Sequence, residues 1–425
     1  MKCVILCAGK SLRMMPLTQT IPKPMLKVAN KPILEHNLSL LTSFVDEFIL
    51  VVGYRKEILI DYLGDIFKGI KITYVEQKEQ KGTGHALLQV RKYIVEHKLD
   101  FSGKFIMLNG DCLYSEKDIE ACIVYNCAIL GAEVPDPENY GVLEYECDGY
   151  SAGSKADDVF LLKNIHEKSK NPISNLINAG LYVFDNHVFD ILSSLKPSVR
   201  GEIELTDAVV ELAKQGPADV KVVKSRNYWL TLTFPWDLLY ANEFFLKMML
   251  GDKDQEGKQQ ILGVVERNAT LKGPVYIGKN TLVKNGSYIE GPVMIGENCT
   301  IGPNCYIRPY TTIGNNCKVG NAVELKNSIM GDKTNVGHLS YVGDSVLGNN
   351  VNFGAGTKIA NLRHDNKHVF SMVKGKLMDS GRRKLGTICG DNVHTGINTS
   401  IYPGRKLFTD VETRPGQIVE KDIEK

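Results

Sequence analysis

The sequence has almost no excess of charge of either sign. Its 425 residues contain 51 Lys and Arg against 49 Asp and Glu. Surfaces that bind nucleic acid or an anionic membrane usually carry a basic excess. We therefore expect neither nucleic acid nor a membrane among the partners of this protein.

Long apolar runs are also missing. No stretch reaches the roughly 18 apolar residues of a membrane-spanning helix. The apolar stretch at the N-terminus, MKCVILCAGK, is much too short for a signal peptide. We therefore expect a cytoplasmic protein, and its length permits two or three domains, each with a substantial core.

A third absence is the cysteine pair C-x-x-C, although the chain contains ten cysteines. Such pairs are typical of metal and redox sites. Cys299, Cys305 and Cys317 instead recur inside a repeated pattern, and Cys299 and Cys317 are 18 residues apart. A free cysteine behaves as a small hydrophobic residue, so we expect these thiols to be buried and structural.

That pattern is an aliphatic residue at every sixth position from Val265 to Leu325. A period of six fits neither a helix, with about 3.6 residues per turn, nor a strand. A hexapeptide repeat explains it, because each hexad forms a short strand and a turn, and three hexads close one coil of a parallel β-helix. We expect the aliphatic residues to point inward, a small residue four positions later to fill the inner corner, and glycines to occupy turns. The aliphatic positions are Val265, Leu271, Ile277, Val283, Ile289, Ile295, Ile301, Ile307, Ile313, Val319 and Leu325, and glycine follows as Gly278, Gly296, Gly302, Gly314 and Gly320.

The repeat shifts by one residue at two places. It resumes at Met330, again at Leu347 and, after an interruption, at Cys389. The shifted region holds the most polar part of the repeat, so it is the first candidate for a functional site. Its polar residues are Asn335, His338, Tyr341, Asp344, Asn352 and Asn361.

Residues 1 to about 250 alternate apolar, strand-like runs with amphipathic, helix-like runs. This alternation predicts an α/β domain with a mainly parallel, doubly wound sheet, in which ligands bind at the carboxyl ends of the strands. Residues 251–260 are polar and predict a linker, and the hexad domain occupies residues 261–425 with a charged C-terminal tail. The predicted strands are Cys3–Leu6, Phe48–Val52, Ile70–Val75 and Phe105–Leu108, and the predicted helices are Ile33–Leu41, Glu57–Leu63, Gly84–Glu96 and Pro235–Leu250.

A glycine-containing loop follows the first predicted strand. Its letters A-G-K-S do not form a P-loop, because that motif needs a glycine where Val4 stands. The backbone N–H groups of such a loop can nevertheless approach phosphate oxygens closely. Arg13 and Lys23 flank the loop, and Lys23 lies between two prolines that fix its backbone. Rigidly held cations of this kind suit the stabilisation of charge during phosphoryl transfer.

The stretch Leu6–Met25 resembles the signature of sugar-1-phosphate nucleotidyltransferases, L-x-A-G-x-G-T-R-M-x-P-L-T followed by P-K-P-M. Further matching segments follow in the family's order at Gln77 and at residues 82–86, 110–111, 140–141, 167 and 178–180. The resemblance implies attack by a sugar-1-phosphate oxygen on the α-phosphorus of a nucleoside triphosphate, with Mg²⁺, Arg13 and Lys23 carrying the charge. It also implies nucleotide binding by Ala8, Gly9, Gln77, Gly82 and Thr83, metal binding by Asp111, and sugar binding by Gly141, Glu167 and Asn178.

The chain departs from this signature at three positions. Ser11 and Leu12 replace the second glycine and the threonine of the motif, and Thr231 stands where a second metal carboxylate is common. A neutral hydroxyl is a weaker ligand than a carboxylate for a hard cation.

The hexad region resembles the acetyltransferase half of bifunctional N-acetylglucosamine-1-phosphate uridyltransferases, in the archaeal form, so the resemblance covers essentially the whole chain. It implies a left-handed β-helix, a homotrimer, and acetyl-CoA and UTP as co-substrates. The matching segments are residues 307–309, 323–326, 336–344, 350–357 and 360–361.

In this resemblance His338 is the general base of acetyl transfer. The substrate ammonium must lose a proton before its nitrogen can attack a thioester, and a neutral imidazole near pH 7 suits that task. Leu362 replaces the family's aromatic residue after Asn361. The implied sugar-phosphate ligands are Arg308, Lys326, Tyr341 and Asn352, and the implied acetyl-CoA ligands are Asn361, Ala355, Arg382 and Arg383.

The favoured hypothesis is a bifunctional transferase that makes UDP-N-acetylglucosamine by acetylating glucosamine-1-phosphate and then joining the product to UMP. One alternative is an acetyltransferase with a non-catalytic nucleotidyltransferase domain, and another is a glucose-1-phosphate thymidylyl- or uridylyltransferase. A third is a non-catalytic scaffold like the exchange-factor subunits of translation initiation. Galactosamine in place of glucosamine, and dTTP in place of UTP, stay open. The basic segment Leu362–Leu385 is either a clamp for the CoA phosphates or a solvated flap.

Overall fold

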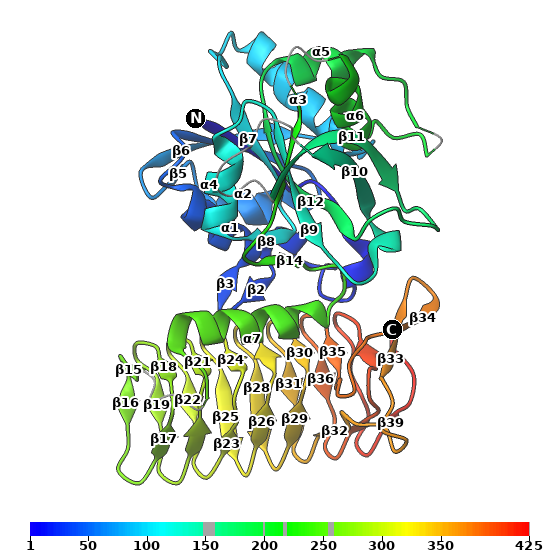
Figure 1. Cartoon of the computed structure of the whole chain (residues 1–425). Coiled ribbons are helices and arrows are strands. Elements are labelled where there is room, and N and C mark those ends of the chain that lie inside the picture. Colours follow the sequence, from blue (N-terminus) through cyan, green and yellow to red (C-terminus); the bar gives the residue numbers. More distant parts are fainter. Residues whose placement is uncertain (148–157, 199, 216–218, 254–258, 425) are drawn as a thin grey trace. The chain divides into compact units, whose positions relative to one another are not determined.

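The computed structural model describes residues 1–147, 158–198, 200–215, 219–253 and 259–424 (Figure 1). Its contacts divide the chain into two compact units. The first consists of Met1–Lys10 and Ile33–Thr231, and the second of Ser11–Pro32 and Leu232–Lys425. The predicted linker falls partly on residues 254–258, outside the described residues.

The first unit is built on a mixed sheet with the strand order β10-β11-β13-β9-β12-β7-β1-β4-β6-β5. Strands β7, β1, β4 and β6 are parallel, as the doubly wound prediction requires, whereas β12 runs antiparallel to both β7 and β9. The strands are β1 Lys2–Leu6, β4 Glu47–Val52, β5 Ile66–Phe67, β6 Ile70–Glu76, β7 Phe105–Asn109, β9 Ala128–Glu133, β10 Gly141–Cys147, β11 Val159–Glu167, β12 Leu176–Phe184 and β13 Lys221–Lys224, with β8 Cys112–Tyr114 and β14 Trp229–Thr231 forming a separate pair.

Helices connect and cover these strands. The helices are α1 Ile33–Leu41, α2 Lys56–Leu63, α3 Thr83–Glu96, α4 Glu116–Ile123, α5 His187–Ser194 and α6 Leu205–Gln215, with a short 3-10 helix at Pro137–Asn139. The parallel strands are buried along most of their length, since Val4, Ile49, Val51 and Met107 are at most 2% exposed. All four predicted strands and the first three predicted helices are confirmed to within one residue at each end. The bounds of these strands and helices could be predicted because their apolar patterns begin and end clearly in the sequence.

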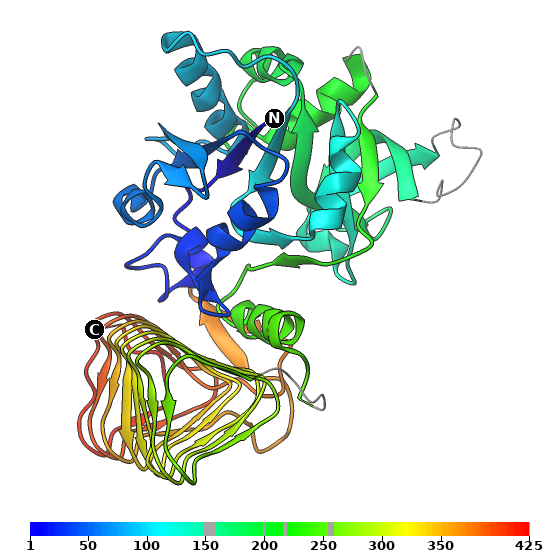
Figure 2. The ribbon, with the colours of Figure 1, turned by 90° about the vertical axis from the view of Figure 1, so that its left-hand side faces the viewer.

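The second unit contains the parallel β-helix that the hexads predict, and its fold class is that of a left-handed parallel β-helix. Successive coils stack behind one another in Figure 2, and strands 18 residues apart pair in register, as Ile277 does with Ile295 and Ile295 with Ile313. The first face contains β15 Gln260–Ile261, β18 Val275–Ile277, β21 Val293–Ile295, β24 Thr311–Ile313, β27 Ile329–Met330, β30 Val346–Leu347, β35 Ile388–Cys389 and β38 Lys406–Leu407. The second contains β16 Val264–Val265, β19 Leu282–Val283, β22 Thr300–Ile301, β25 Lys318–Asn321, β28 Asn335–His338, β31 Asn352–Phe353 and β36 His394–Thr395. The third contains β17 Thr270–Lys272, β20 Tyr288–Glu290, β23 Tyr306–Ile307, β26 Glu324–Lys326, β29 Tyr341–Gly343, β32 Lys358–Ile359, β37 Ser400–Ile401 and β39 Ile418–Val419.

The core of the β-helix is the predicted column of aliphatic residues, closed at its corners by small side chains. Ile277, Ile301 and Ile313 have no exposed surface. Cys299, Cys305 and Cys317 are 1% to 3% exposed and unpaired, and the backbone N–H of Cys317 donates to Sγ of Cys299 at 3.4 Å. The prediction of structural, buried thiols is confirmed for these three residues.

The glycines of the repeat serve a different purpose from the one predicted. Of the five, only Gly302 has a positive φ, at +89°. A Cβ on Gly296 would lie 2.6 Å from the carbonyl oxygen of Gly314, so these glycines allow neighbouring coils to approach closely. The left-handed turn residue is instead the asparagine two positions later, for example Asn298 with φ +56° and Asn316 with φ +58°. Asparagine tolerates this conformation better than most residues.

The register shifts correspond to two shortened coils. Ile313 pairs with Met330, and Met330 pairs with Leu347, so each of these coils has 17 residues instead of 18. The missing residue falls at the corner that follows the third face, where Asn327 and Asp344 have positive φ angles. The ladder itself continues through both shifts, so a shorter corner, and not a broken ladder, distinguishes this region. The interruption contains the hairpin β33 Phe370–Val373 and β34 Lys376–Asp379.

Two segments from outside the hexads also belong to the second unit. One is α7, Asp237–Leu250, which lies along the stacked coils in Figure 1, with Asn242 donating to the carbonyl oxygen of Tyr310 at 3.0 Å. The other is Ser11–Pro32, with 3-10 helices at Leu12–Met14 and Lys23–Met25 and the strands β2 Lys27–Val28 and β3 Lys31–Pro32. The contact grouping therefore differs from the predicted division at residue 250.

Among the described residues, no helix is both long enough and apolar enough to cross a membrane.

Replacing Ile301 by alanine should destabilise the β-helix by about 2 to 5 kcal/mol, because it empties a fully buried site. Thr300→Ala, on the outward side of the same strand, is the matched control and should change stability by no more than about 0.5 kcal/mol. Chemical denaturation followed by circular dichroism measures both. Equal losses for the two variants would contradict the inward orientation of the repeat.

Candidate functional sites

In the first unit, the predicted base-binding residues gather beyond the carboxyl ends of β1 and β6. Gln77 is 4% exposed, and its side-chain amide donates to the carbonyl oxygen of Gly82 at 3.1 Å. Gln80 donates to the carbonyl oxygen of Ala8 at 2.8 Å. The chain turns at Gly82 with φ +98°, and a Cβ there would lie 2.5 Å from the carbonyl oxygen of Ile203. Glycine is therefore required at this position by both conformation and space.

Thr83 begins α3, and its hydroxyl accepts the backbone N–H of Leu205 at 3.2 Å. Gly9 follows Ala8 in the loop after β1, and a Cβ on Gly9 would meet no atom within 4 Å. This loop is therefore open on the side that Gly9 faces, as close approach by a ligand requires.

Asp111 follows β7, next to the first strand of the sheet. The backbone N–H of Gly110 donates to the carbonyl oxygen of Leu6 at 3.0 Å, which joins the two strand ends. Thr231 pairs with Cys112, the residue after Asp111, so the departure from the family pattern lies beside the predicted metal ligand. Among the described residues no group of three or more His, Cys, Asp or Glu side chains could hold a metal ion.

This donor set suits Mg²⁺ better than a transition metal. Mg²⁺ is commonly held by one or two carboxylates while it keeps several waters and phosphate oxygens. Asp111 would supply one carboxylate, which fits an ion that takes its other oxygens from water and substrate.

The three predicted sugar ligands lie on neighbouring strands. Gly141 pairs with Glu167 across β10 and β11, and a Cβ on Gly141 would lie 3.0 Å from the Glu167 carboxylate. Asn178, at a bulge of β12, donates to the hydroxyl of Tyr182 at 2.6 Å and accepts the N–H of Gly180 at 2.9 Å. Burial raises the pKa of Tyr182, the hydrogen bond from Asn178 opposes the rise, and the charge of Glu167 adds to it. The structure therefore places all three on one region of the sheet.

Arg13 and Lys23, the predicted catalytic cations, belong to the second unit. Arg13 is exposed, and its guanidinium lies 6.0 Å from the ring centre of Phe234. Lys23 is only 4% exposed. Ser11 has the left-handed angles φ 50° and ψ 50°, a conformation that glycine adopts more readily than serine.

Asp237 is a buried carboxylate on which the charge of Lys23 acts. Its Oδ2 accepts the N–H groups of Thr233 and Phe234, both at 2.7 Å. Burial raises the pKa of Asp237 to about 6, while these hydrogen bonds and then the charges of Lys23 and Arg382 oppose the rise. The charges of Lys23 and Arg382 therefore favour the ionised form of Asp237.

The raised pKa of Asp237 has a consequence for stability. The folded state keeps the proton to a higher pH than the unfolded state, so as pH rises from about 4 to about 6 ionisation favours unfolding. Across that window the wild type should lose up to about 3 kcal/mol relative to Asp237→Asn. Denaturant titrations of both proteins at pH 4.5 and pH 7 measure the difference. A stability gap that stays constant with pH would contradict the assignment.

The second site surrounds Asp344, at the second shortened corner of the β-helix. Asp344 is 2% exposed and accepts from Lys326 at 3.0 Å, from Asn327 at 2.8 Å and from Asn361 at 2.6 Å. Asn361 also donates to the hydroxyl of Tyr341 at 3.2 Å. A buried carboxylate that receives an ammonium and two amides fixes all three in orientation. The sequence places Asp344 within the polar cluster but gives it no role.

Cations border this cluster on the third face. Arg308 forms a 2.9 Å ion pair with Glu324, a residue that the sequence analysis did not single out. The charge of Lys326 lowers the pKa of Lys384, so two ammonium groups face the same space. An anion such as a phosphate would relieve that repulsion, which agrees with the predicted role of Lys326.

His338 and Asn352 lie elsewhere on the same coils. His338 ends β28 on the second face, is exposed, and accepts the N–H of Gly356 at its carbonyl oxygen, with Ala355 next in the chain. Asn352 pairs with Asn335, which begins the strand that His338 ends. Asn335 is three residues from His338, so the two are roughly 10 Å apart along the strand. The structure therefore brings together Arg308, Lys326, Tyr341 and Asn361, but within one chain it does not bring Asn352 to them.

The predicted acetyl-CoA ligands are divided as well. Arg382 is partly buried, and burial lowers its pKa although the carboxylates of Asp344, Glu243 and Asp237 oppose the effect. Arg383 is exposed. A cavity of about 610 Å³ lies beside the interrupting hairpin, and part of its lining comes from the basic segment Leu362–Leu385. Its lining residues are Ala360, Leu362, Arg363, His364, Asp365, Val369, Phe370, Tyr402, Pro403, Arg405 and Glu420.

Comparison with known proteins agrees with this two-part architecture. The nucleotidyl transferase family model matches residues 2–247, and the model of the GMPPB C-terminal domain matches residues 289–407. A solved structure of UDP-glucose pyrophosphorylase with UDP-glucose matches 58% of this chain and 98% of its own, with a TM-score of 0.51 and 24% identity, which supports the fold of the N-terminal half. These findings define the first half as a nucleotidyl transferase.

Several relatives match over the whole chain. The bifunctional protein GlmU of Methanococcus maripaludis strain C7 is 44% identical over all of this chain and 96% of its own length. The bifunctional sugar-1-phosphate nucleotidylyltransferase/acetyltransferase of Sulfurisphaera tokodaii is 39% identical over all of this chain and 98% of its own. The chain therefore belongs to the family of the bifunctional protein GlmU.

Proposed function

We propose that this protein is a bifunctional transferase of UDP-N-acetylglucosamine synthesis, with acetyl transfer at the β-helix and uridylyl transfer by the nucleotidyl transferase half. The observation that carries the proposal is the match to bifunctional relatives at 39% to 44% identity over the whole chain. The cluster around Asp344 supports the first activity, and the residues beyond β1, β6 and β7 support the second.

In acetyl transfer, Lys326 and Arg308 hold the phosphate of glucosamine-1-phosphate. Asn361, which Asp344 and Tyr341 orient, lies beside the reacting amine. His338 takes a proton from the substrate ammonium, and the freed nitrogen attacks the thioester carbonyl of acetyl-CoA. The nitrogen–carbon bond forms, the carbon–sulfur bond breaks, and CoA leaves with its sulfur protonated at the end of the step.

The acetyltransferase site is completed by a second copy of this chain, so the active form is a homotrimer. The supporting observation is that His338 and Asn352 lie on the second face of the β-helix, whereas the phosphate and amine ligands lie on the third. Flat faces of this kind can be brought together by neighbouring copies around a threefold axis.

In uridylyl transfer, Gln77, Gly82 and Thr83 hold the base of UTP, and Gly141, Glu167 and Asn178 hold the sugar. A phosphate oxygen of N-acetylglucosamine-1-phosphate attacks the α-phosphorus, and pyrophosphate leaves. Arg13 and Lys23 stabilise the charge that develops on the transferring group. Asp111 would hold Mg²⁺, with Thr231 beside it, and the ion supplies charge neutralisation at the phosphates.

His338→Ala should abolish acetyl transfer and leave uridylyl transfer unchanged, because only the first reaction needs the imidazole. The loss expected for a general base is about 10²- to 10⁴-fold in kcat. Release of CoA from acetyl-CoA and glucosamine-1-phosphate measures the first reaction, and pyrophosphate release from UTP and N-acetylglucosamine-1-phosphate measures the second. Equal loss of both activities would contradict two separate sites.

Asp344→Asn should also reduce acetyl transfer, through loss of the charge that orients Lys326 and Asn361. We expect KM for glucosamine-1-phosphate to rise, since the ammonium that binds its phosphate is released. Steady-state kinetics with varied glucosamine-1-phosphate measures KM, and Glu297→Gln, which removes an exposed carboxylate elsewhere on the β-helix, serves as the control. An unchanged KM together with normal kcat would refute the role of Asp344.

A second candidate function is acetyl transfer alone, with a nucleotidyl transferase half that only binds. Thr231 beside Asp111 favours it, because a carboxylate is missing at that position. The conformation of Ser11 opposes it, because this residue takes left-handed angles that the glycine of the family motif could also take. Pyrophosphate release by the wild type in the presence of Mg²⁺ decides between the two, and the absence of turnover would establish the second candidate.

A further inference from the structure

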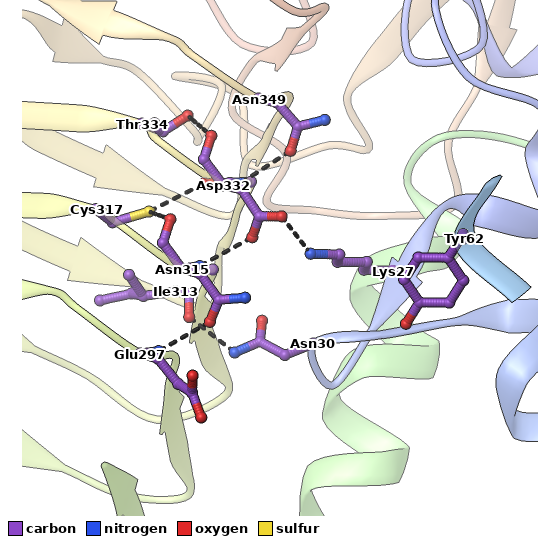
Figure 3. A network of polar contacts seen from close by, with 12 residues as sticks. Lys27, Asn30, Tyr62, Glu297, Ile313, Asn315, Cys317, Asp332, Thr334 and Asn349 are labelled. Atoms are coloured by element: carbon purple, nitrogen blue, oxygen red, sulfur yellow. Dashed lines mark hydrogen bonds and ion pairs between the residues drawn. The ribbon is translucent and has the colours of Figure 1, made fainter. Parts of the chain in front are cut away.

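Five residues in equivalent positions form a hydrogen-bonded column along one corner of the β-helix. Each follows a glycine of the repeat, and each side chain after the first accepts the backbone N–H of the residue one coil earlier (Figure 3). The distances are 2.8 Å from Glu297 to Asn315, 2.8 Å from Asn315 to Asp332, 2.9 Å from Asp332 to Asn349 and 2.7 Å from Asn349 to Asp391. The column therefore needs one acceptor oxygen at each level.

An asparagine meets that need fully. Asn315 and Asn349 accept through their amide oxygens at the same distances as Asp332 and Asp391 do through Oδ1. The negative charge of the two aspartates, and their second oxygen, are therefore not required by the stacking of the coils. Both second oxygens have another partner.

Those partners lie in the segment Ser11–Pro32. Lys27 forms a 2.6 Å ion pair with Oδ2 of Asp332, and Thr20 donates to Oδ2 of Asp391 at 2.7 Å. Asn30 donates to the carbonyl oxygen of Ile313 at 2.7 Å, on the same corner, and Figure 3 shows Lys27 and Asn30 reaching toward it side by side. Each of the three contacts joins residues about 280 to 370 positions apart in the sequence.

The last coils hold the same segment further toward its N-terminal end. The ammonium of Lys406, which is 2% exposed, donates to the carbonyl oxygen of Met15 at 2.9 Å. The backbone N–H of Thr409 donates to the side chain of Gln19 at 2.9 Å. The segment is thus fastened at several points on both sides of Lys23, and its Met15 anchor lies two residues from Arg13.

We propose that Asp332, Asp391 and Lys406 are positioning residues for nucleotidyl transfer: they hold on the β-helix the segment that carries Arg13 and Lys23. The expected effect of these residues on activity rests on the proposed uridylyl transfer. Their expected effect on the conformation of the segment is independent of that proposal. The β-helix is then a structural part of the nucleotidyl transferase machinery as well as the carrier of acetyl transfer.

The first test uses the pair Lys27 and Asp332. Asp332→Asn keeps the oxygen that accepts from Asn315 but places an amide donor against the Lys27 ammonium, and Lys27→Met removes the cation. Each variant should lower kcat for pyrophosphate release about 10- to 100-fold, as small misplacements of catalytic groups do. CoA release in the same preparation should be unchanged.

Controls separate positioning from loss of fold. Glu297→Gln removes an exposed carboxylate from the same column, and both activities should stay at the wild-type level. Lys27→Arg keeps the ion pair and should restore most of the lost uridylyl transfer. The double variant Lys27→Met with Asp332→Asn should be no slower than either single variant, because both act through one contact.

Hydrogen–deuterium exchange tests the conformational part without any substrate. Peptides within residues 12–32 should exchange several-fold faster in Lys27→Met, in Thr20→Val and in Lys406→Met than in the wild type, while coil peptides around Ile301 keep their protection. Unchanged exchange in all three variants, or uridylyl transfer that falls only in step with acetyl transfer, overturns the proposal. If exchange is accelerated in these variants but the wild type itself shows no uridylyl transfer, the anchoring is upheld and the proposed function is rejected instead.

Discussion

The close stacking of one β-helix coil on the next is the constraint on which the second unit depends. At many corners glycine lets neighbouring backbones approach, and asparagine or aspartate often turns the chain through left-handed angles. Because the stacking is regular, each residue of a coil lies directly above the equivalent residue of the next coil. Asn327 and Asp344 meet in this way, as do the Asn and Asp residues of the corner column.

The candidate site of this unit lies where the regular stack departs from its period. Each of two successive coils lacks one residue at the same corner, and a buried carboxylate occupies the second of these shortened corners. Because the strands on either side keep their register, the change is confined to the corner, and the neighbouring faces still supply ligands at fixed heights. A rigid scaffold with one altered corner can hold polar groups in place at little cost to its own stability.

The repeat and the first strands could be predicted because their signals are periodic and local. The aliphatic residues at every sixth position define the coil, and long apolar runs such as Phe48–Val52 define the central sheet. The roles of Asp344 and Glu324 could not be predicted, since they depend on which side chains the coil length brings together. The expectation that glycine occupies the turns is wrong for most of these glycines, since asparagine takes the left-handed positions. The sequence shows that glycine recurs, but it does not show whether conformation or close packing requires it.

The placement of Ser11–Pro32 was beyond sequence reasoning for a similar reason, because nothing near Lys27 or Thr20 indicates a partner some 300 residues later. Its consequence concerns how the chain can be divided. A fragment that ends at residue 250 would keep every motif of a nucleotidyl transferase and yet lose the carboxylates, the buried lysine and the coil carbonyl that hold its cationic segment. The motifs place the domain boundary at residue 250, whereas the contacts group Ser11–Pro32 with the β-helix. Only the grouping by contacts keeps this segment together with the residues that hold it.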